Sequence, residues 1–288
     1  MTQQSVMITG ASTGIGFATA EYLAAKGWRV FAGVRKQADA DRLADALGEI
    51  VTPVLCDVTD GDQVNAAGEA VRAALGDDNL TGLVNNAGVA VAGPLLHLPV
   101  EDMQAQLEIN VTGQLRATQA FAPLLGAERG RGGAPGRIVN ISSVAGFNAM
   151  PLVTPYACSK FAMEAFTQGL RRELMLYGID VIAINPGPIA TPIWDKAEEL
   201  DPEQYAHTDY DGPIRKLLGY MLERGRKGLP PVKVAEAVYA GLTDAKPRLN
   251  TVITPDRFQQ WLLSVLPARM TDKMITKQLN LTADQQSS

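Results

Sequence analysis

The amino-acid sequence predicts an α/β fold, a doubly wound parallel sheet with helices on both faces. Short apolar and β-branched runs alternate with longer segments of helical periodicity along the 288 residues, which is typical of consecutive βαβ units. A glycine-rich segment directly after the first run opens a helix, as expected for a sheet that binds a ligand at the carboxyl ends of its strands. Neither an internal repeat nor a linker divides the sequence, so residues 1–288 are expected to form one domain.

Each expected element follows from this alternation in order along the chain. The strands are predicted at residues 6–9, 29–34, 51–56, 83–85, 137–141, 181–184 and 251–253. The helices are predicted at residues 14–26, 38–47, 63–75, 100–125, 156–177 and 232–243. Two stretches do not fit the alternation. We interpret residues 193–230 as an insertion that forms a lid over one end of the sheet, and residues 255–288 as a C-terminal extension.

Composition argues against several classes of protein. Hydrophobic residues make up 46% and charged residues 20% of the chain, with a net charge of −5, so a globular protein is expected. The 26 basic residues are outnumbered by 31 acidic ones and form no run, which argues against nucleic acid as a partner. No apolar stretch reaches the ~20 residues that span a bilayer, and no signal peptide is recognisable. Because the only cysteines are Cys56 and Cys158, we predict a cytoplasmic protein without a disulfide scaffold, and we predict no metal site.

The glycine-rich segment, residues 9–16, has the sequence TGASTGIG. Glycines at such a junction let the backbone turn tightly and approach a phosphate, and the N-terminus of the following helix offers N–H groups to a pyrophosphate. Residues 10–14 also fit the G-x-S-x-G pattern of a hydrolase nucleophile elbow. That elbow needs a histidine at a strand end late in the chain, and the sequence has only His97 and His207. We therefore favour a dinucleotide site.

The end of the second predicted strand bears on the choice of cofactor. A carboxylate at this position would bind the ribose 2′-hydroxyl of NAD, but Val34 and Arg35 stand there instead. A guanidinium suits a 2′-phosphate, so NADP(H) is the predicted cofactor and NAD(H) the alternative, unless Arg35 is only a solvated surface residue. Asp57, after the third strand, is interpreted either as an acceptor for the adenine amino group or as a turn or helix cap.

A tyrosine and a lysine lie at the start of a later helix. Thr154 is expected to cap this helix and Pro155 to take its first position. Tyr156 and Lys160 are four residues apart and therefore share one face of the helix. We expect the ammonium to lower the pKa of the phenol, which would make Tyr156 an acid or base near neutral pH.

The strand before this helix ends in two serines, within the segment ISS (141–143). The further motifs are TGASTGIG (9–16), NNAG (85–88), INVTG (109–113), YACSK (156–160) and NPGPIATP (185–192). In this order they resemble the short-chain dehydrogenase/reductase family, and within it the hydroxysteroid and retinol dehydrogenases. The resemblance covers about residues 5–192. It implies a Rossmann-type sheet of seven strands and an oxidoreductase that acts on alcohol and carbonyl groups with a nicotinamide cofactor.

The resemblance also implies roles for individual residues. Tyr156 is the acid/base, Lys160 lowers its pKa and holds the nicotinamide ribose, and Asn110 anchors a water that completes a proton relay. The family's usual spacing of 13 residues before the tyrosine selects Ser143 as the catalytic serine, with Ser142 packed beneath it. The residues implied to contact the cofactor are Gly10, Ser12, Thr13, Gly14, Ile15, Gly16, Arg35, Asp57, Val58, Asn86, Ala87, Gly88, Tyr156, Lys160, Pro186, Gly187, Ile189 and Thr191.

The substrate pocket is expected between the insertion and the loops after the fourth and fifth strands. These segments are largely apolar, which predicts a lipophilic substrate, steroid-, retinoid- or lipid-like. The residues predicted to line the pocket are Ser143, Phe147, Met150, Tyr156 and Trp194.

The sequence thus leads to a functional hypothesis. We predict an NADP(H)-dependent oxidoreductase that interconverts a secondary alcohol and a ketone, as a homodimer or homotetramer. One alternative is a non-catalytic NAD(P)-binding regulator, which the intact set of Ser143, Tyr156 and Lys160 argues against. The other is an NAD-preferring dehydrogenase of a small alcohol.

Overall fold

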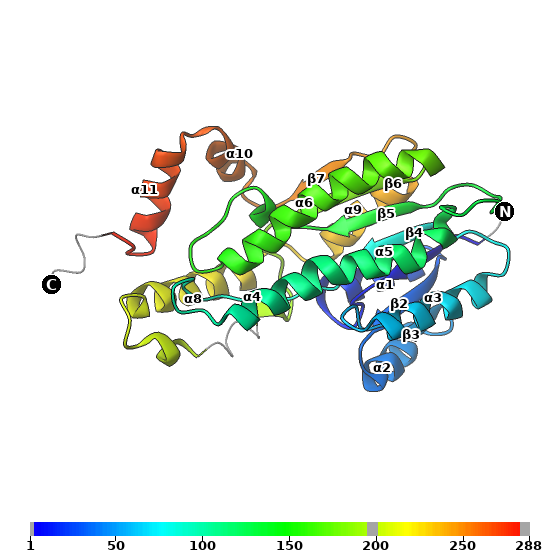
Figure 1. Cartoon of the computed structure of the whole chain (residues 1–288), viewed down its shortest axis with the longest axis horizontal. Helices are drawn as coiled ribbons and strands as arrows, with labels where there is room; N and C mark the ends of the chain where they lie inside the picture. Colours follow the sequence, from blue (N-terminus) through cyan, green and yellow to red (C-terminus); the bar gives the residue numbers. More distant parts are fainter. Residues whose placement is uncertain (1–2, 195–200, 283–288) are drawn as a thin grey trace.

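The computed structural model describes residues 3–194 and 201–282, and a parallel sheet forms its centre (Figure 1). The seven strands lie in the order β3-β2-β1-β4-β5-β6-β7, and every neighbouring pair is parallel. The predicted seven-stranded, doubly wound sheet is confirmed. The strands are β1 (Ser5–Ile8), β2 (Arg29–Val34), β3 (Val51–Leu55), β4 (Gly82–Asn85), β5 (Arg137–Ile141), β6 (Asp180–Pro186) and β7 (Asn250–Ile253).

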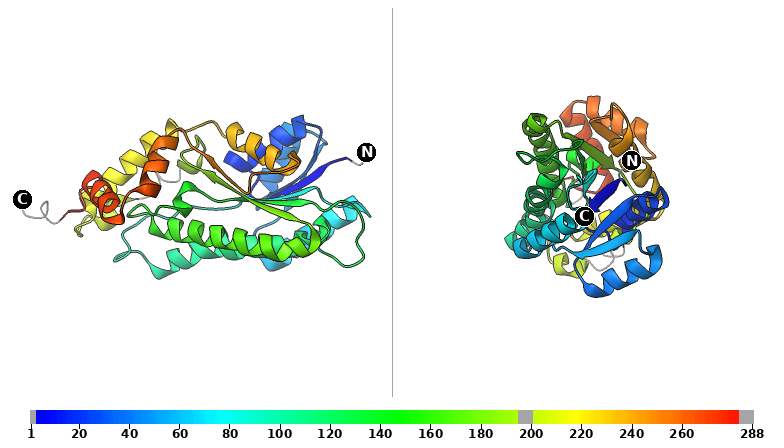
Figure 2. Two further views of the ribbon diagram at one scale, coloured as in Figure 1. Left: turned by 90° about the horizontal axis from the view of Figure 1, so that it is seen from above. Right: turned by 90° about the vertical axis from the view of Figure 1, so that its right-hand side faces the viewer.

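Helices cover both faces of the sheet (Figure 2). One face carries α1 (Gly14–Ala25), α2 (Gln37–Leu47) and α9 (Val232–Thr243). The other carries α3 (Gly61–Leu75), α4 (Val100–Leu107), α5 (Gly113–Phe121) and α6 (Thr154–Leu174). In β1, Val6 and Ile8 belong to the core under the first set and Met7 to the core under the second. The sheet is therefore buried on both faces, as expected for a parallel sheet.

The direction in which strands are added reverses between β1 and β4, and such a reversal opens a crevice at the carboxyl ends of the two strands. The Thr9 hydroxyl accepts hydrogen bonds from the backbone N–H groups of Asn86 and Ala87, both 3.0 Å long. The Asn86 amide in turn donates to the carbonyls of Thr9 and Gly10. These bonds hold the loop after β1 against the loop after β4, where the cofactor site is predicted.

Two of the predicted helices differ from the observed ones. Residues 100–125 do not form one regular helix, because a π-helical turn at Glu108–Thr112 separates α4 from α5 and a 3₁₀ turn at Pro123–Leu125 ends the segment. The later helix, α6, begins at Thr154 itself. The prediction that Thr154 caps this helix is therefore wrong, since Val153 occupies the cap position.

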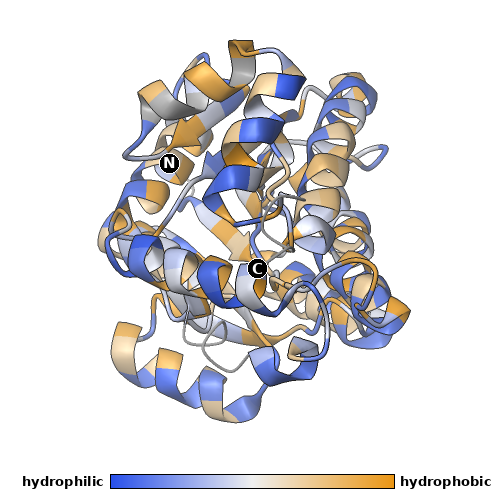
Figure 3. Ribbon diagram, turned by 90° about the vertical axis from the view of Figure 1, so that its left-hand side faces the viewer, coloured by the Kyte–Doolittle hydropathy of each residue, from blue (hydrophilic) through white to orange (hydrophobic). Residues whose placement is uncertain are grey.

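The predicted insertion lies at the end of the molecule that Figure 3 faces, where hydrophobic and hydrophilic residues alternate along the helical ribbons. A 3₁₀ turn, Pro202–Tyr205, leads into α8 (Asp211–Arg226). Residues 195–200 of the insertion lie outside the described residues. The far end of the insertion returns to the loop after β6, where Leu229 forms an isolated parallel bridge with Ile189.

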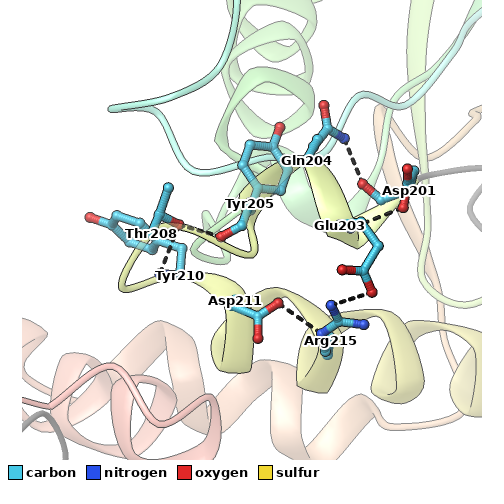
Figure 4. A network of polar contacts seen from close by, with 8 residues as sticks. All are labelled: Asp201, Glu203, Gln204, Tyr205, Thr208, Tyr210, Asp211 and Arg215. Atoms are coloured by element: carbon cyan, nitrogen blue, oxygen red, sulfur yellow. Dashed lines mark hydrogen bonds and ion pairs between the residues drawn. The ribbon is translucent and has the colours of Figure 1, made fainter.

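Polar contacts connect the short turn to α8 (Figure 4). Arg215 donates to the carboxylates of Glu203 at 2.7 Å and Asp211 at 2.8 Å. The Thr208 hydroxyl donates to the carbonyl of Tyr205 at 2.8 Å. Exposed ion pairs contribute little to stability, so these contacts mainly set the direction in which α8 leaves the turn.

An apolar cluster joins the insertion to the C-terminal extension. Its buried members are Leu152, Tyr205, Ile214, Leu217 and Leu279. Leu279 directly follows α11 (Ala268–Gln278), which α10 (Arg257–Val265) precedes. The extension is thus packed on the insertion, and its residues 283–288 lie outside the described part. Within the described ranges, no helix has the length and apolarity that crossing a membrane requires.

Gly113 allows α5 to approach the loop after β3 closely. A Cβ atom on Gly113 would lie 2.7 Å from Cγ2 of Val58 and 3.1 Å from its carbonyl oxygen. We expect Gly113→Ala to lower the free energy of unfolding by about 1–3 kcal/mol, the usual cost of overpacking. Gly169→Ala in α6 is the control, because a Cβ atom there would meet nothing within 4 Å and alanine favours the helix. Urea unfolding compares the two variants, and equal stability would contradict the prediction.

Candidate active site

A serine, a tyrosine and a lysine meet at the carboxyl ends of the central strands. Ser143 follows β5, whereas Tyr156 and Lys160 lie in the first two turns of α6. The Ser143 side chain lies close enough to the Tyr156 phenol to act on its pKa. It also donates to the Pro186 carbonyl at 3.3 Å and accepts from the Ala145 N–H at 3.1 Å. Two hydroxyl groups are therefore held side by side, where both can reach one substrate oxygen.

Ser142 occupies a different environment from its neighbour. Its hydroxyl lies against α6 and donates to the Lys160 carbonyl at 3.5 Å. Successive residues of extended backbone point to opposite sides, which is why Ser143 faces Tyr156 while Ser142 lies under the helix. This is the arrangement that the resemblance implied for the two serines.

The ammonium group of Lys160 is buried behind Tyr156. Lys160 is only 6% exposed, and its Nζ atom donates to the Ile141 carbonyl at 2.9 Å. Nζ lies 5.6 Å from the centre of the Tyr156 ring. Burial lowers the pKa of Lys160 to about 8, and the nearby carboxylate of Glu164 opposes this shift. Lys160 can therefore lose its charge within the pH range in which enzymes work.

The pKa of Tyr156 shifts in the direction opposite to our prediction. Burial raises the pKa of the phenol, and the hydrogen bond with Ser143 lowers it by a smaller amount. Lys160 does not reverse the shift, because its ammonium is bonded to the Ile141 carbonyl and not to the phenol oxygen. Tyr156 thus stays protonated at neutral pH, which suits a group that donates a proton.

The π-helical turn places Asn110 against the loop after β4. The Asn110 amide donates to the Val89 carbonyl at 3.0 Å and accepts from the Val89 N–H at 2.9 Å. It also donates to the Ser159 hydroxyl at 3.0 Å. The side chain is engaged with protein groups, so the water-anchoring role of Asn110 stays a prediction. π-Helical turns are frequent at functional sites.

Two glutamines that the sequence analysis did not identify support the same loop. Gln106 donates to the Val89 carbonyl at 2.9 Å, and Gln114 donates to the Ala87 carbonyl. Both side chains are buried. Their spacing could have identified them in the sequence, because Gln106, Asn110 and Gln114 follow one another at intervals of four residues.

The turn after β1 has the shape of a phosphate-binding loop. Gly10 and Gly14 have φ angles of 64° and 59°, a region that favours glycine. A Cβ atom on Gly10 would lie 2.8 Å from Cα of Ala87. The Thr13 side chain does not cap α1, so it leaves the N-terminus of this helix to an anionic ligand. These residues fit the pyrophosphate of a dinucleotide.

The other residues predicted to bind the cofactor border the same crevice. Those in or beside the glycine turn are Ser12, Ile15, Gly16, Asn86, Ala87 and Gly88, and those after β6 are Gly187, Ile189 and Thr191, with Pro186 as its last residue. Thr191 lies opposite the turn, because a Cβ atom on Gly14 would be 3.4 Å from its side chain. Their contacts with a cofactor stay predictions.

Asp57 and Val58 follow β3, where the adenine site is predicted. Asp57 Oδ1 accepts from the N–H and the hydroxyl of Thr59, at 3.0 and 2.8 Å. This is the turn that our second interpretation of Asp57 expected, and its contact with adenine stays a prediction. Val58 is buried beside Gly113.

Two arginines flank the glycine turn from the side of β2. Arg35 is exposed directly after this strand. Arg42 of α2, which the sequence analysis missed, donates to the Ser12 carbonyl at 2.7 Å and to Asp39 at 2.9 Å. Nothing local in the sequence points to Arg42, because the contact depends on how α2 packs beside the turn.

The residues predicted to contact substrate differ in their surroundings. Met150 packs against the apolar cluster of the insertion, and Phe147 is 47% exposed. Trp194 donates its indole N–H to the Ile189 carbonyl at 2.6 Å, and its ring covers Gly225 of α8. Trp194 therefore holds the insertion against the loop after β6, and its contact with substrate stays a prediction. Among residues 3–194 and 201–282, no group of three histidine, cysteine or carboxylate side chains could hold a metal ion.

Comparison with known proteins agrees with this geometry. The model of the short chain dehydrogenase family matches residues 4–201. The protein is a short-chain dehydrogenase. A similar relative is the "NADPH-dependent 3-dehydrocapnine reductase" of Ornithobacterium rhinotracheale, 38% identical over 95% of this chain and 96% of its own. The mitochondrial D-beta-hydroxybutyrate dehydrogenase of Rattus norvegicus is 32% identical over 94% of this chain and 83% of its own.

A solved structure shares the fold over most of its length. The short-chain dehydrogenase/reductase of Burkholderia phymatum in complex with NAD has a TM-score of 0.77 and 25% identity, covering 94% of this chain and 95% of that one. As a member of this family, the protein is an oxidoreductase that acts on CH–OH and C=O groups with a nicotinamide cofactor. The hydrolase and the non-catalytic regulator are therefore set aside.

The two serines offer a test of the site. We expect Ser143→Ala to lower kcat by about 100- to 1000-fold, the usual effect of removing one donor to a reacting oxygen. Ser142→Ala should change thermal stability more than kcat, because its hydroxyl bonds only the Lys160 carbonyl. Steady-state kinetics and thermal unfolding of both variants measure the contrast. A larger loss of kcat in Ser142→Ala would mean that Ser142, and not Ser143, is the catalytic serine.

Proposed function

We propose that the protein uses NADPH to reduce a ketone on a lipophilic substrate to a secondary alcohol. The observation that carries the proposal is the closeness of Ser143 to the Tyr156 phenol, which burial keeps protonated. A protonated phenol is the form needed to deliver a proton to a carbonyl oxygen.

The proton-transfer chemistry follows from the positions of three side chains. Ser143 turns its O–H from the Pro186 carbonyl to the substrate carbonyl oxygen and polarises the C=O bond, and Tyr156 gives its proton to the same oxygen. Lys160 lies behind the ring, where its positive charge stabilises the phenolate that remains. The bound nicotinamide supplies the hydride. The glycine turn would hold its pyrophosphate, and Lys160 its ribose.

The surroundings of the 2′ position favour NADPH. Arg35 follows β2 without a carboxylate beside it, and Arg42 brings a second guanidinium to the glycine turn. Guanidinium groups match phosphate oxygens in both charge and geometry. The relative from Ornithobacterium is named as NADPH-dependent, which agrees with this preference.

The insertion supports a lipophilic substrate. It contributes buried Ile214 and Leu217 to an apolar cluster against which Met150 packs. If Phe147 and Met150 line the pocket as predicted, apolar side chains beside two hydroxyl groups suit a molecule with one polar reacting group on a hydrocarbon body, such as a steroid, a retinoid or a lipid. The relative named as a 3-dehydrocapnine reductase supports reduction as the direction of the reaction. The relative named as a D-beta-hydroxybutyrate dehydrogenase is the observation that favours the alternative, a dehydrogenase of a small alcohol.

We propose further that the protein is a cytoplasmic homodimer or homotetramer. Cys56 and Cys158 are both free thiols, which suits a reducing compartment. Leu115 of α5 and Phe161 of α6 are large apolar side chains that stay more than two-fifths exposed, and they offer a surface to a second copy of the chain.

The cofactor preference rests on Arg35. We expect NADPH to bind about ten- to a hundredfold more tightly than NADH, since a hydrogen bond to a charged group contributes about 1.5–3 kcal/mol. Arg35→Ala should remove most of this difference by weakening NADPH alone. Lys233→Ala, which deletes an exposed charge on α9, is the control and should change neither affinity. Dissociation constants from fluorescence titration decide the question, and tighter binding of NADH by the unmodified protein would contradict the preference.

The substrate class is tested with a homologous series of ketones. Oxidation of NADPH is followed with 3-oxo compounds whose hydrocarbon chains grow from four carbons upward. Each methylene buried in an apolar site contributes about 0.8 kcal/mol, so kcat/KM should rise about fourfold per added CH₂ until the pocket is filled. Tyr156→Phe should lose at least ~100-fold in kcat with every ketone. A preference for the four-carbon acid together with NADH would favour the small hydroxy acid instead.

A further inference from the structure

A buried carboxylate lies one helical turn beyond Lys160. Glu164 of α6 is only 8% exposed, and the proposed proton transfer does not use it. Burying a charge is costly unless hydrogen-bond donors and an opposite charge compensate for it. The surroundings of Glu164 therefore indicate what this carboxylate does.

Both carboxylate oxygens of Glu164 accept hydrogen bonds from amides of the sheet. Oε1 accepts from Asn185 of β6 at 2.5 Å, and Oε2 accepts from Asn250 of β7 at 3.1 Å. An ionised carboxylate only accepts hydrogen bonds, so two donors match its charged form. The Cγ atom of Glu164 also supports the turn after Ser143, since a Cβ atom on Gly146 would lie 3.1 Å from it.

Asn185 connects Glu164 to the reacting end of β5. The same Nδ2 atom that bonds Glu164 also donates to the Ser143 carbonyl at 3.4 Å. In the other direction, Glu164 and Lys160 are four residues apart on α6, so they share one helix face. One carboxylate is thus linked to the backbone of Ser143 and stands one helical turn from Lys160.

We propose that Glu164 is a positioning residue for the active site. Its carboxylate keeps Lys160 charged and, through Asn185, fixes the end of β5 that presents Ser143. This inference rests on the proposed function, because it concerns the protonation state of Lys160 in the same reaction.

The electrostatic environment agrees with this role. Lys160 faces two titratable groups, Tyr156 and Glu164, and both belong to α6. Burial lowers the pKa of Lys160 to about 8, and the carboxylate of Glu164 opposes that shift. Tyr156 has a raised pKa, so Lys160 is the first of the two to lose its proton as the pH rises. Ketone reduction should therefore decline above about pH 8, with Lys160 as its cause.

The environment of Glu164 itself also includes one cation besides Lys160. Arg171, two turns further along α6, lines the same small surface hollow as Glu164 and Asn250. The neighbouring strands β6 and β7 present amides to the carboxylate. A charge placed at the exposed position 250 would therefore act on Glu164 from outside the core.

The decisive variant is Glu164→Gln, which keeps the shape of the side chain and removes its charge. We expect the decline of kcat at high pH to move to lower pH by at least about half a unit, because an adjacent opposite charge shifts a pKa by about 1–3 units. KM for the ketone should change less than kcat. Asn250→Lys brings an ammonium to the same carboxylate from an exposed position and should shift the decline in the same direction, so it serves even if Glu164→Gln folds poorly.

Two controls separate positioning from simple stabilisation. Thr167→Val removes a buried hydroxyl of α6 that bonds Asn140 and the Met163 carbonyl, so it should lower the melting temperature without moving the pH profile. Asn250→Gln keeps position 250 uncharged and should also leave the profile in place. If Glu164→Gln and Asn250→Lys fold and their profiles coincide with that of the unmodified protein, Glu164 is only structural and the inference fails.

A readout that does not depend on turnover distinguishes this failure from failure of the proposed function. In protein with ¹³C-labelled lysine, the Cε signal of Lys160, assigned with Lys160→Arg, reports its titration directly. Its midpoint should fall in Glu164→Gln and stay unchanged in Thr167→Val. An unchanged midpoint in Glu164→Gln overturns the inference, whatever the substrate is. If the midpoint falls but the unmodified protein reduces no ketone, Glu164 still keeps Lys160 charged and it is the proposed reaction that is refuted.

Discussion

The rest of the active site depends on the hydrogen bonds between the loops after β1 and β4. Thr9 accepts from two N–H groups of the second loop, and Asn86 donates back to two carbonyls of the first. At this point the order of strands reverses, so the two loops would otherwise diverge. Closing them with hydrogen bonds from side chain to backbone fixes the glycine turn relative to α4–α6, and a cofactor and the Tyr156 phenol can then share one crevice.

The sheet also fixes the positions of the predicted reacting groups. Ser143 and Asn185 stand at the ends of β5 and β6, whose register is set by five paired residues. Tyr156, Lys160 and Glu164 come from a single helix packed on those strands. Chemistry that needs an accuracy of fractions of an ångström is thereby placed on rigid elements. The insertion and the C-terminal extension pack on each other outside these elements.

Much of this arrangement could be predicted from the sequence, and what could not has a physical reason. The strands were predictable because their apolar runs are short and separated by helical segments. The placement of Ser143 beside Tyr156 followed from motif spacing. The raised pKa of Tyr156 was not predictable, because it depends on burial of the phenol among segments that are distant in the sequence. Arg42 and Glu164 were missed for the same reason, since their partners lie on other elements.

The π-helical turn between α4 and α5 was equally hidden, because its residues continue the helical pattern on both sides, and it has a geometric consequence. In a regular α-helix each residue advances by about 100°, so residues four apart drift by about 40° and residues eight apart by about 80°. Gln106, Asn110 and Gln114 nevertheless all reach one short loop. The wider turn at Glu108–Thr112 absorbs one residue and cancels part of that angular drift. The π-helical turn thus lets side chains from α4, from the turn itself and from α5 all contact the extended loop after β4.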